Sequence, residues 1–144
     1  MSQAYLVGID CSDCGHRAVD YAAEEAAAHD ATVIVAHIIE WSPYSFNTNQ
    51  ENAERHQRRE AELDRAHKEI VDPVVGKLQE KGIDAKGVVR HGHIAKTLEA
   101  LAEELGATSI VVGRHGDSGL VSHLFGSVPG TLVQISDRPV TVVP

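Results

Sequence analysis

The chain has 144 residues, of which 13 are Lys or Arg and 21 are Asp or Glu, so its formal net charge is −8. This acidity argues against a nucleic-acid partner, since such a protein needs a Lys- and Arg-rich face to neutralise phosphates. An apolar content of 42% is enough for a hydrophobic core, and two cysteines are too few to staple a secreted disulfide scaffold. No apolar run reaches membrane-spanning length, and the first residues lack a signal-peptide pattern. We therefore expect one soluble, cytoplasmic domain over residues 1–144, without a membrane partner.

Five segments of strand length, rich in Val and Ile, predict β-strands. Three are near-continuous apolar runs, which are typical of parallel strands buried on both faces, and two are weaker. In chain order the five are Ala4–Asp10, Thr32–Glu40, Asp84–Arg90, Thr108–Gly113 and Pro139–Val143.

Helical patterns separate these strands. Apolar residues form one stripe between Ala18 and Ala26, and they recur at steps of three and four from Ile94 to Leu105. Gly82 and Gly106 are predicted to end the helices that precede them.

A long, highly charged helix is predicted between the second and third strands, at about residues 51–81. Pro73 lies inside it and is expected to kink or divide it, because proline has no N–H to donate. The positions expected to be buried come late in this helix and are Leu63, Ile70, Val74 and Leu78.

The alternation of strands and helices predicts an α/β fold, a doubly wound parallel sheet with right-handed crossovers. We expect five strands in the order 3-2-1-4-5, a Rossmann-like arrangement of the adenine nucleotide α-hydrolase type. Such sheets bind ligands at the carboxyl ends of the strands where the winding reverses. The site is therefore expected at Asp10 and from Gly113 onward.

A glycine-containing segment follows the fourth strand, with Gly113, Gly116 and Gly126 followed by Ser127. Glycine allows close backbone approach by a ligand, and a helix starting near Ser127 would direct free N–H groups at a phosphate. The segment is not a Walker-type loop, because no lysine follows Lys96. Spacing alone leaves two interpretations open, a phosphate loop and ordinary turn glycines.

The pattern G-x2-G-x9-G-[ST] after the fourth strand, together with Asp10 at the end of the first, resembles the ATP-binding branch of the universal stress protein family. The resemblance covers essentially the whole chain, from YLVGID to PVTVV. It implies ATP as the ligand, with AMP or ADP as alternatives and with Mg²⁺ held mainly by the phosphates.

The resemblance also implies roles for single residues. Asp10, preceded by Gly8 and Ile9, would contact the ribose or the adenine side, and the backbone of Ile38 would recognise the adenine edge. Gly113 would lie beside the ribose. The phosphates would be bound by Gly116, Gly126, Ser127 and Val128, with Arg114 and His115 as additional contacts.

The expected function is that of an ATP-binding regulatory module with slow or no turnover, because no base, lid or arginine finger is evident. Two alternatives remain open: a nucleotide-free dimeric protein that binds protein partners, and a weak ATPase or autophosphorylating switch. The family resemblance implies a homodimer through Pro139–Val143, which would cover an apolar sheet edge.

Two further patterns invite a metal or redox interpretation. Cys11 and Cys14 form a C-x-x-C at a predicted helix start, although two small residues of a turn are the favoured interpretation. No metal site is expected from the histidines, which are scattered over the chain as His16, His29, His37, His56, His67, His91, His93, His115 and His123.

Overall fold

A parallel β-sheet forms the centre of the protein. The computed structural model describes residues 3–10, 16–40, 49–114 and 127–144, and within them the sheet has five strands in the order β3-β2-β1-β4-β5. This confirms the predicted fold class and strand order. The strands are β1 (Ala4–Gly8), β2 (Thr32–Glu40), β3 (Ala85–Gly92), β4 (Ser109–Gly113) and β5 (Val140–Val143).

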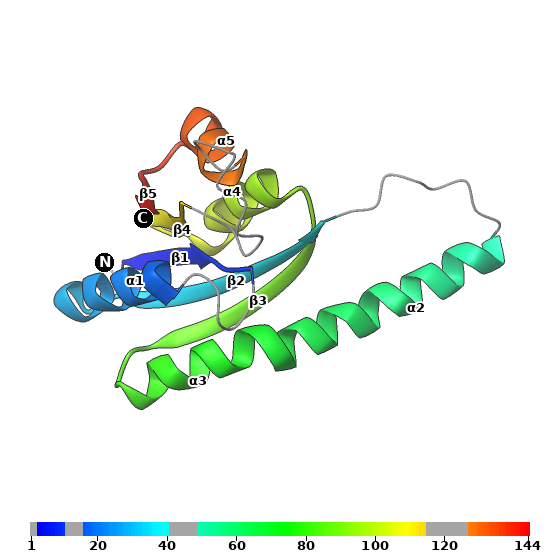
Figure 1. Ribbon diagram of the computed structural model, residues 1–144, viewed down its shortest axis with the longest axis horizontal. Helices are drawn as coiled ribbons and strands as arrows, with labels where there is room; N and C mark the ends of the chain where they lie inside the picture. The colour runs from blue at the N-terminus through cyan, green and yellow to red at the C-terminus, as the bar shows by residue number, and fades with distance from the viewer. Residues whose placement is uncertain (1–2, 11–15, 41–48, 115–126) are drawn as a thin grey trace.

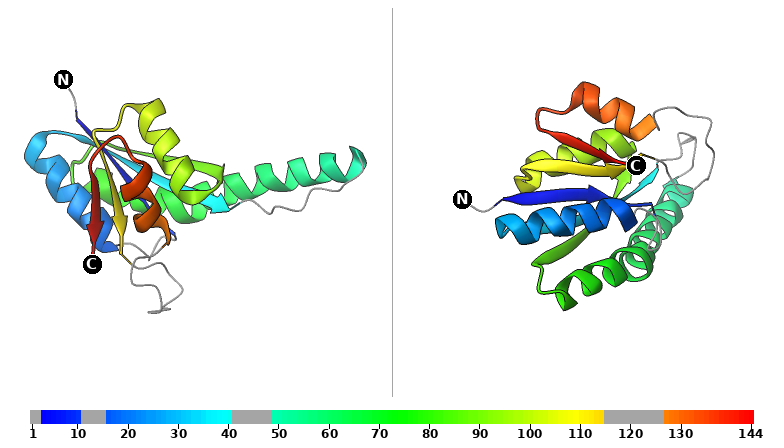
Figure 2. Two further views of the ribbon diagram at one scale, coloured as in Figure 1. Left: turned by 90° about the horizontal axis from the view of Figure 1, so that it is seen from above. Right: turned by 60° about the vertical axis from the view of Figure 1, so that its left-hand side comes forward.

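Helices cover both faces of the sheet (Figures 1 and 2). One apolar cluster joins α1 and the η1–α3 region to one face, and a second joins α4 and α5 to the other. Among the described residues, no helix is both long and apolar enough to cross a membrane. The helices are α1 (His16–His29), α2 (Asn49–Ala66), the π-helical segment η1 (His67–Val71), α3 (Asp72–Glu80), α4 (Ile94–Leu105) and α5 (Ser127–Ile135).

Two strand ends differ from the prediction by two residues, and β3, β4 and β5 each start one residue later than predicted. β1 ends at Gly8 rather than Asp10, because its pairing with β2 ends at Gly8 and Ala36. β3 continues to Gly92, beyond the predicted end at Arg90, because β2 is long enough to pair with it as far as Glu40. Pairing with a neighbouring strand thus overrides the local pattern at both ends.

The charged helix expected at 51–81 is divided by a π-helical turn. In η1 the Asp72 N–H donates to the His67 carbonyl, which is the wider spacing of a π-turn, and Pro73 lies in the first turn of α3. The structure therefore confirms that the helix is interrupted near Pro73, where the missing N–H removes a helical hydrogen bond.

The π-turn also changes which residues of this helix are buried. Val74 and Leu78 are buried as predicted, whereas Leu63 and Ile70 are only partly buried. Ala66 and Val71 are buried in addition. The prediction assumed a uniform period of 3.6 residues, and the π-turn shifts the face that meets the sheet.

Gly87 of β3 allows the π-turn to approach the sheet. A Cβ atom at Gly87 would lie 2.1 Å from Cγ1 of Val71 and 3.3 Å from Cγ2 of Val75. The first distance is far shorter than any normal van der Waals contact, so the packing of η1 on β3 requires glycine here.

Gly82 and Gly106 end their helices as predicted. Both have left-handed backbone angles, with φ of 79° and 68°. The Gly106 N–H donates to carbonyls of the last turn of α4, which is the usual C-terminal cap.

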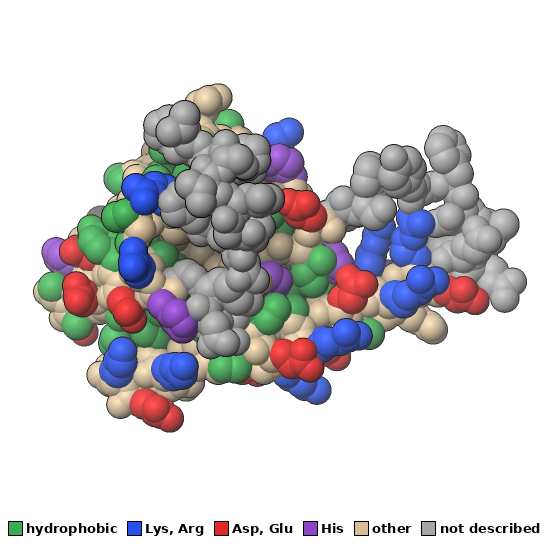
Figure 3. Space-filling model, in the orientation of Figure 1, with side chains coloured by type: hydrophobic (Ala, Val, Ile, Leu, Met, Phe, Trp, Pro, Cys, Tyr) green, Lys and Arg blue, Asp and Glu red, His purple; other side chains and the backbone are tan. Residues whose placement is uncertain are grey.

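The amino-terminal part of α2 extends beyond the sheet (Figure 1). Acidic and basic side chains are interspersed along this helix (Figure 3), and one pair at i,i+4 spacing, His56 and Glu60, lies 3.1 Å apart. Such pairs on a solvated helix contribute little individually to stability.

We expect Gly87→Ala to destabilise the protein by about 1–3 kcal/mol, because the added methyl group overlaps Val71. Chemical denaturation followed by circular dichroism measures this. The double variant Gly87→Ala, Val71→Ala should recover part of the loss.

Gly76→Ala is the matched control, since a Cβ at this position in α3 meets nothing within 4 Å. It should leave stability unchanged or raise it by about 0.5–1 kcal/mol through helix propensity. Equal effects of the two alanine substitutions would contradict the packing argument.

Candidate functional site

The carboxyl ends of β1 and β4 meet at the centre of one sheet edge. Gly8 pairs with Val112 on one side and with Ala36 on the other, so β1 and β4 end side by side while β2 continues past them to Glu40. The order β3-β2-β1-β4-β5 reverses its direction of winding between β1 and β4. This is the position at which doubly wound sheets bind ligands.

Asp10 lies at this edge, just past the end of β1. Asp10 is exposed and lies in a bend, whereas Ile9 before it is 5% exposed and belongs to the core. Burial of Ile9 therefore fixes the backbone next to Asp10, whose own residue is exposed at the edge.

Gly8 has a packing role that the sequence did not suggest. A Cβ here would lie 3.0 Å from Cδ1 of Leu98 in α4 and 3.5 Å from Cγ1 of Val112. Close approach of α4 to β1 thus accounts for glycine at this position, and a contact of Gly8 with a ligand stays a prediction.

Ile38 lies on β2 near the same edge. Its side chain is 6% exposed and packs in the cluster beneath α4. The preceding residue, His37, uses Nδ1 to donate a hydrogen bond of 2.9 Å to the carbonyl of Ile9. The ring thus links β2 to the residue that follows β1, a contact that the sequence analysis missed when it counted His37 among scattered histidines.

The end of β4 contributes Gly113 and Arg114. The Arg114 N–H donates to the Val143 carbonyl at 2.7 Å, and the residue is exposed. His115, Gly116 and Gly126 lie outside the described residues, as do Cys11 and Cys14, and their predicted roles stay predictions.

α5 begins at Ser127, at the predicted helix start. Its first turn lies on the side of the sheet toward which β4 and β5 point (Figure 2, right). Val128 is partly buried against the α4-side cluster. The N–H groups of such a first turn have no partner within their helix and attract anions.

The titratable groups described in the structure form no cluster suited to a metal. Within residues 3–10, 16–40, 49–114 and 127–144, no three His, Cys, Asp or Glu side chains gather closely enough to bind an ion. Burial raises the pKa of the Tyr5 phenol, and the Glu25 carboxylate adds to this effect. Tyr5 lies at the start of β1, away from the edge that carries Asp10.

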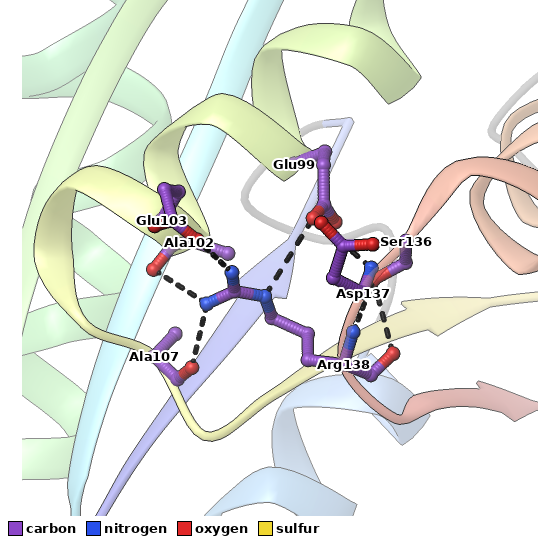
Figure 4. Close-up of polar contacts among 7 residues, drawn as sticks. All are labelled: Glu99, Ala102, Glu103, Ala107, Ser136, Asp137 and Arg138. Carbon is purple, nitrogen blue, oxygen red and sulfur yellow. Dashed lines mark hydrogen bonds and ion pairs between the residues drawn. The ribbon is translucent and has the colours of Figure 1, made fainter.

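Arg138, directly before β5, ties this strand to the rest of the fold (Figure 4). Its Nη1 donates to the carbonyls of Ala102 and Ala107, both at 2.9 Å, and its Nη2 pairs with Glu103. Its Nε lies 3.7 Å from Oε1 of Glu99, an oxygen that also accepts the Asp137 N–H. One mostly buried guanidinium thus joins the end of α4 to the starts of β4 and β5.

The architecture described so far is a doubly wound parallel α/β sheet with an open edge at its topological switch point. The model of the universal stress protein family matches residues 1–144. Universal stress protein A homolog 1 of Coxiella burnetii is 33% identical, over 96% of this chain and 93% of its own length. The chain belongs to the universal stress protein family.

Solved structures have the same fold. The universal stress protein UspA from Lactobacillus plantarum superposes with a TM-score of 0.82 at 21% identity, covering 99% of this chain and 97% of its own. A universal stress protein solved in complex with cAMP is 28% identical, with a TM-score of 0.63 over 99% of this chain and 97% of its own.

Arg138→Met should destabilise the protein by about 2–4 kcal/mol, because it removes two carbonyl partners and leaves the Glu99 carboxylate, 17% exposed, without its cation. Urea denaturation gives the value. Adding Glu99→Gln should recover part of the loss, since it removes the unpaired charge.

Arg90→Met is the control, because Arg90 and Glu104 form an exposed pair at 3.9 Å. Its effect should be within about 0.5 kcal/mol. A comparable loss of unfolding free energy in Arg138→Met and Arg90→Met would show that the burial of Arg138 does not account for its effect on stability.

Proposed function

We propose that this chain is a cytoplasmic regulatory module that binds ATP, or AMP or ADP, at the carboxyl edge of β1, β2 and β4. The observation that carries the proposal is the meeting of Asp10, the Ile38 backbone and Gly113 at one edge where the winding reverses. The relative in complex with cAMP, at 28% identity over nearly the whole chain, supports an adenine nucleotide as the ligand.

Within this proposal, the first turn of α5 and the glycines before it bind the phosphates. The candidate groups are the backbone N–H groups of Gly116, Gly126, Ser127 and Val128, with Arg114 and His115 supplying positive charge. Mg²⁺ would be held mainly by phosphate oxygens and water, as is common for this ion. Asp10 would bind the ribose through hydrogen bonds to its hydroxyl groups.

Turnover is expected to be slow or absent. Among the described residues, no group of three His, Cys, Asp or Glu side chains at the site edge is suited to bind a metal. Phosphoryl transfer depends on positioned cations and an oriented nucleophile, so binding alone does not imply hydrolysis.

We expect the purified protein, after denaturation, to release close to one adenine nucleotide per chain, identified by chromatography. Titration with Mg-ATP measures the affinity of the stripped protein. Gly126→Val should weaken it about tenfold or more, because a side chain at this position would block hydrogen bonds from the backbone to phosphate.

Gly76→Ala in α3, distant from this edge, should bind as the parent does. Parent-like binding by Gly126→Val would remove the phosphate loop from the proposal. Absence of both released and titratable nucleotide would favour the nucleotide-free dimer, and phosphate release above the Gly126→Val level would favour the weak ATPase or autophosphorylating switch.

The proposal includes a homodimer formed through the last strand. β5 pairs with β4 on one side and is the last strand of the sheet, and all four of its residues are partly exposed. Val133 and Ile135 on the adjacent α5 are 60% and 39% exposed. An exposed apolar edge of this kind requires a cover, and a second copy of the same edge provides one.

Val142→Pro tests this interface. Pro139 and Val143 direct their carbonyls to β4, so by alternation Thr141 also faces β4 and the Val142 N–H faces outward. Proline at Val142 should preserve the β4–β5 pairing and abolish the dimer, because it removes an outward donor. Analytical ultracentrifugation should show the mass falling from two chains to one.

Thr141→Pro is the matched control, since it removes a donor from the β4–β5 pairing itself. It should lower thermal stability far more than Val142→Pro. A Val142→Pro variant that stays dimeric would place the interface elsewhere.

A further inference from the structure

The backbone of β2 alternates between its two neighbours, and this determines where Ile38 faces. The Thr32 N–H donates to Gln3 and the Ala36 carbonyl accepts from Ile9, whereas the Val33 N–H donates to Asp84 on the β3 side. Even-numbered residues of β2 thus face β1 and odd-numbered residues face β3. The N–H and the carbonyl of Ile38 therefore point to the β1 side.

Ile38 nevertheless lies outside the β1–β2 ladder. The register between these strands ends at Gly8 and Ala36, although the Ile9 N–H still donates to Ala36 at 2.9 Å. The next bond of a regular parallel ladder would join the Ile38 N–H to the Ile9 carbonyl. In this structure that carbonyl accepts from Nδ1 of His37, also at 2.9 Å.

The His37 ring thus bonds to the carbonyl that would otherwise extend the ladder, and the Ile38 N–H does not bond to it in this structure. A carbonyl oxygen can only accept, so Nδ1 carries the proton. The ring is half-buried beside Ile9, a core residue, and a hydrogen bond in such a place holds the strand end in one conformation. As a consequence, the Ile38 N–H and carbonyl are presented together beyond the end of β1.

We propose that His37 is a positioning residue for base recognition: by capping the Ile9 carbonyl, it reserves the backbone of Ile38 for the adenine ring. With the base held in one orientation, the Ile38 N–H donates to N1 of adenine and its carbonyl accepts from the 6-amino group. Hypoxanthine presents the opposite order, a donor at N1 and an acceptor at C6, and so does not match. The inference rests on the proposed nucleotide-binding function and deepens it.

The test compares ATP and inosine triphosphate on three proteins: the parent, His37→Phe and His37→Asn. Phenylalanine keeps a planar ring without a donor, and asparagine places an amide N–H near the position of Nδ1. His37→Phe should lose about 3- to 10-fold in ATP affinity, as expected for one neutral hydrogen bond, and little in inosine triphosphate affinity. His37→Asn should retain the preference of the parent for ATP. Calorimetric titration measures all six affinities.

If His37 had a purely structural role, His37→Phe would lose affinity for both nucleotides equally and its preference for ATP would be unchanged. That result would overturn the inference. If His37→Phe does not fold, His37→Leu replaces it, because leucine also lacks a donor and suits a half-buried strand position.

Amide hydrogen exchange provides a readout without nucleotide. The Ile38 amide should exchange more slowly in His37→Phe than in the parent, because it is then able to bond to the released Ile9 carbonyl. An unchanged rate would contradict the capping role.

The two proposals fail in different ways. A parent protein that binds no adenine nucleotide would overturn the proposed function and the base-recognition role of His37 with it. A parent that binds ATP, with His37→Phe showing the same ATP preference, would overturn only the role of His37.

Discussion

The rest of the structure depends on the position and length of the central strand β1. It pairs in parallel with β2 on one side and with β4 on the other, so the two halves of the winding are joined through it. Because β1 ends at Gly8 while β2 continues to Glu40, the backbone of β2 emerges beyond its neighbour. A strand that ends early between longer or offset neighbours creates an edge with backbone groups outside the ladder. Asp10 and Ile38 lie at this edge.

Two glycines set the distance between the helices and this sheet, one on each face. Gly8 admits Leu98 of α4, and Gly87 admits Val71 of the π-turn. In both cases the tight contact comes from a residue of a different element, and at Gly87 it excludes a side chain. Interiors are packed as densely as organic crystals, so a single methyl group at Gly87 is enough to disturb the fit. The packing of the π-turn on β3 therefore depends on glycine at position 87.

Arg138 has a corresponding role at the amino-terminal end of β4 and β5. Its guanidinium bonds to the carbonyls of Ala102 and Ala107, and it faces the carboxylates of Glu99 and Glu103. Neither Nε of Arg138 nor Oε2 of Glu99, both buried, forms a hydrogen bond with the described residues. This part of the fold is held by both hydrogen bonds and charge, and removing one partner of such a buried pair leaves the other charge without compensation.

The amino-acid sequence by itself determined the elements, their order and the edge at which the site is expected. Apolar runs in Val- and Ile-rich segments, helical periodicity and glycine stops are local signals, and the topology rules for parallel sheets then leave few arrangements. Asp10 and Gly113 were predicted at one edge for this reason, and Ile38 was added from the family resemblance.

Only the tertiary structure decided where β1 and β3 end, which face of the divided helix is buried, and what His37 and Arg138 contact. These features depend on pairing and packing between residues far apart in the chain, such as Val71 with Gly87, and no local pattern encodes such distances. His37 shows the difference: its place beside Ile38 is visible in the sequence, but its bond to Ile9 exists only because β1 and β2 lie side by side.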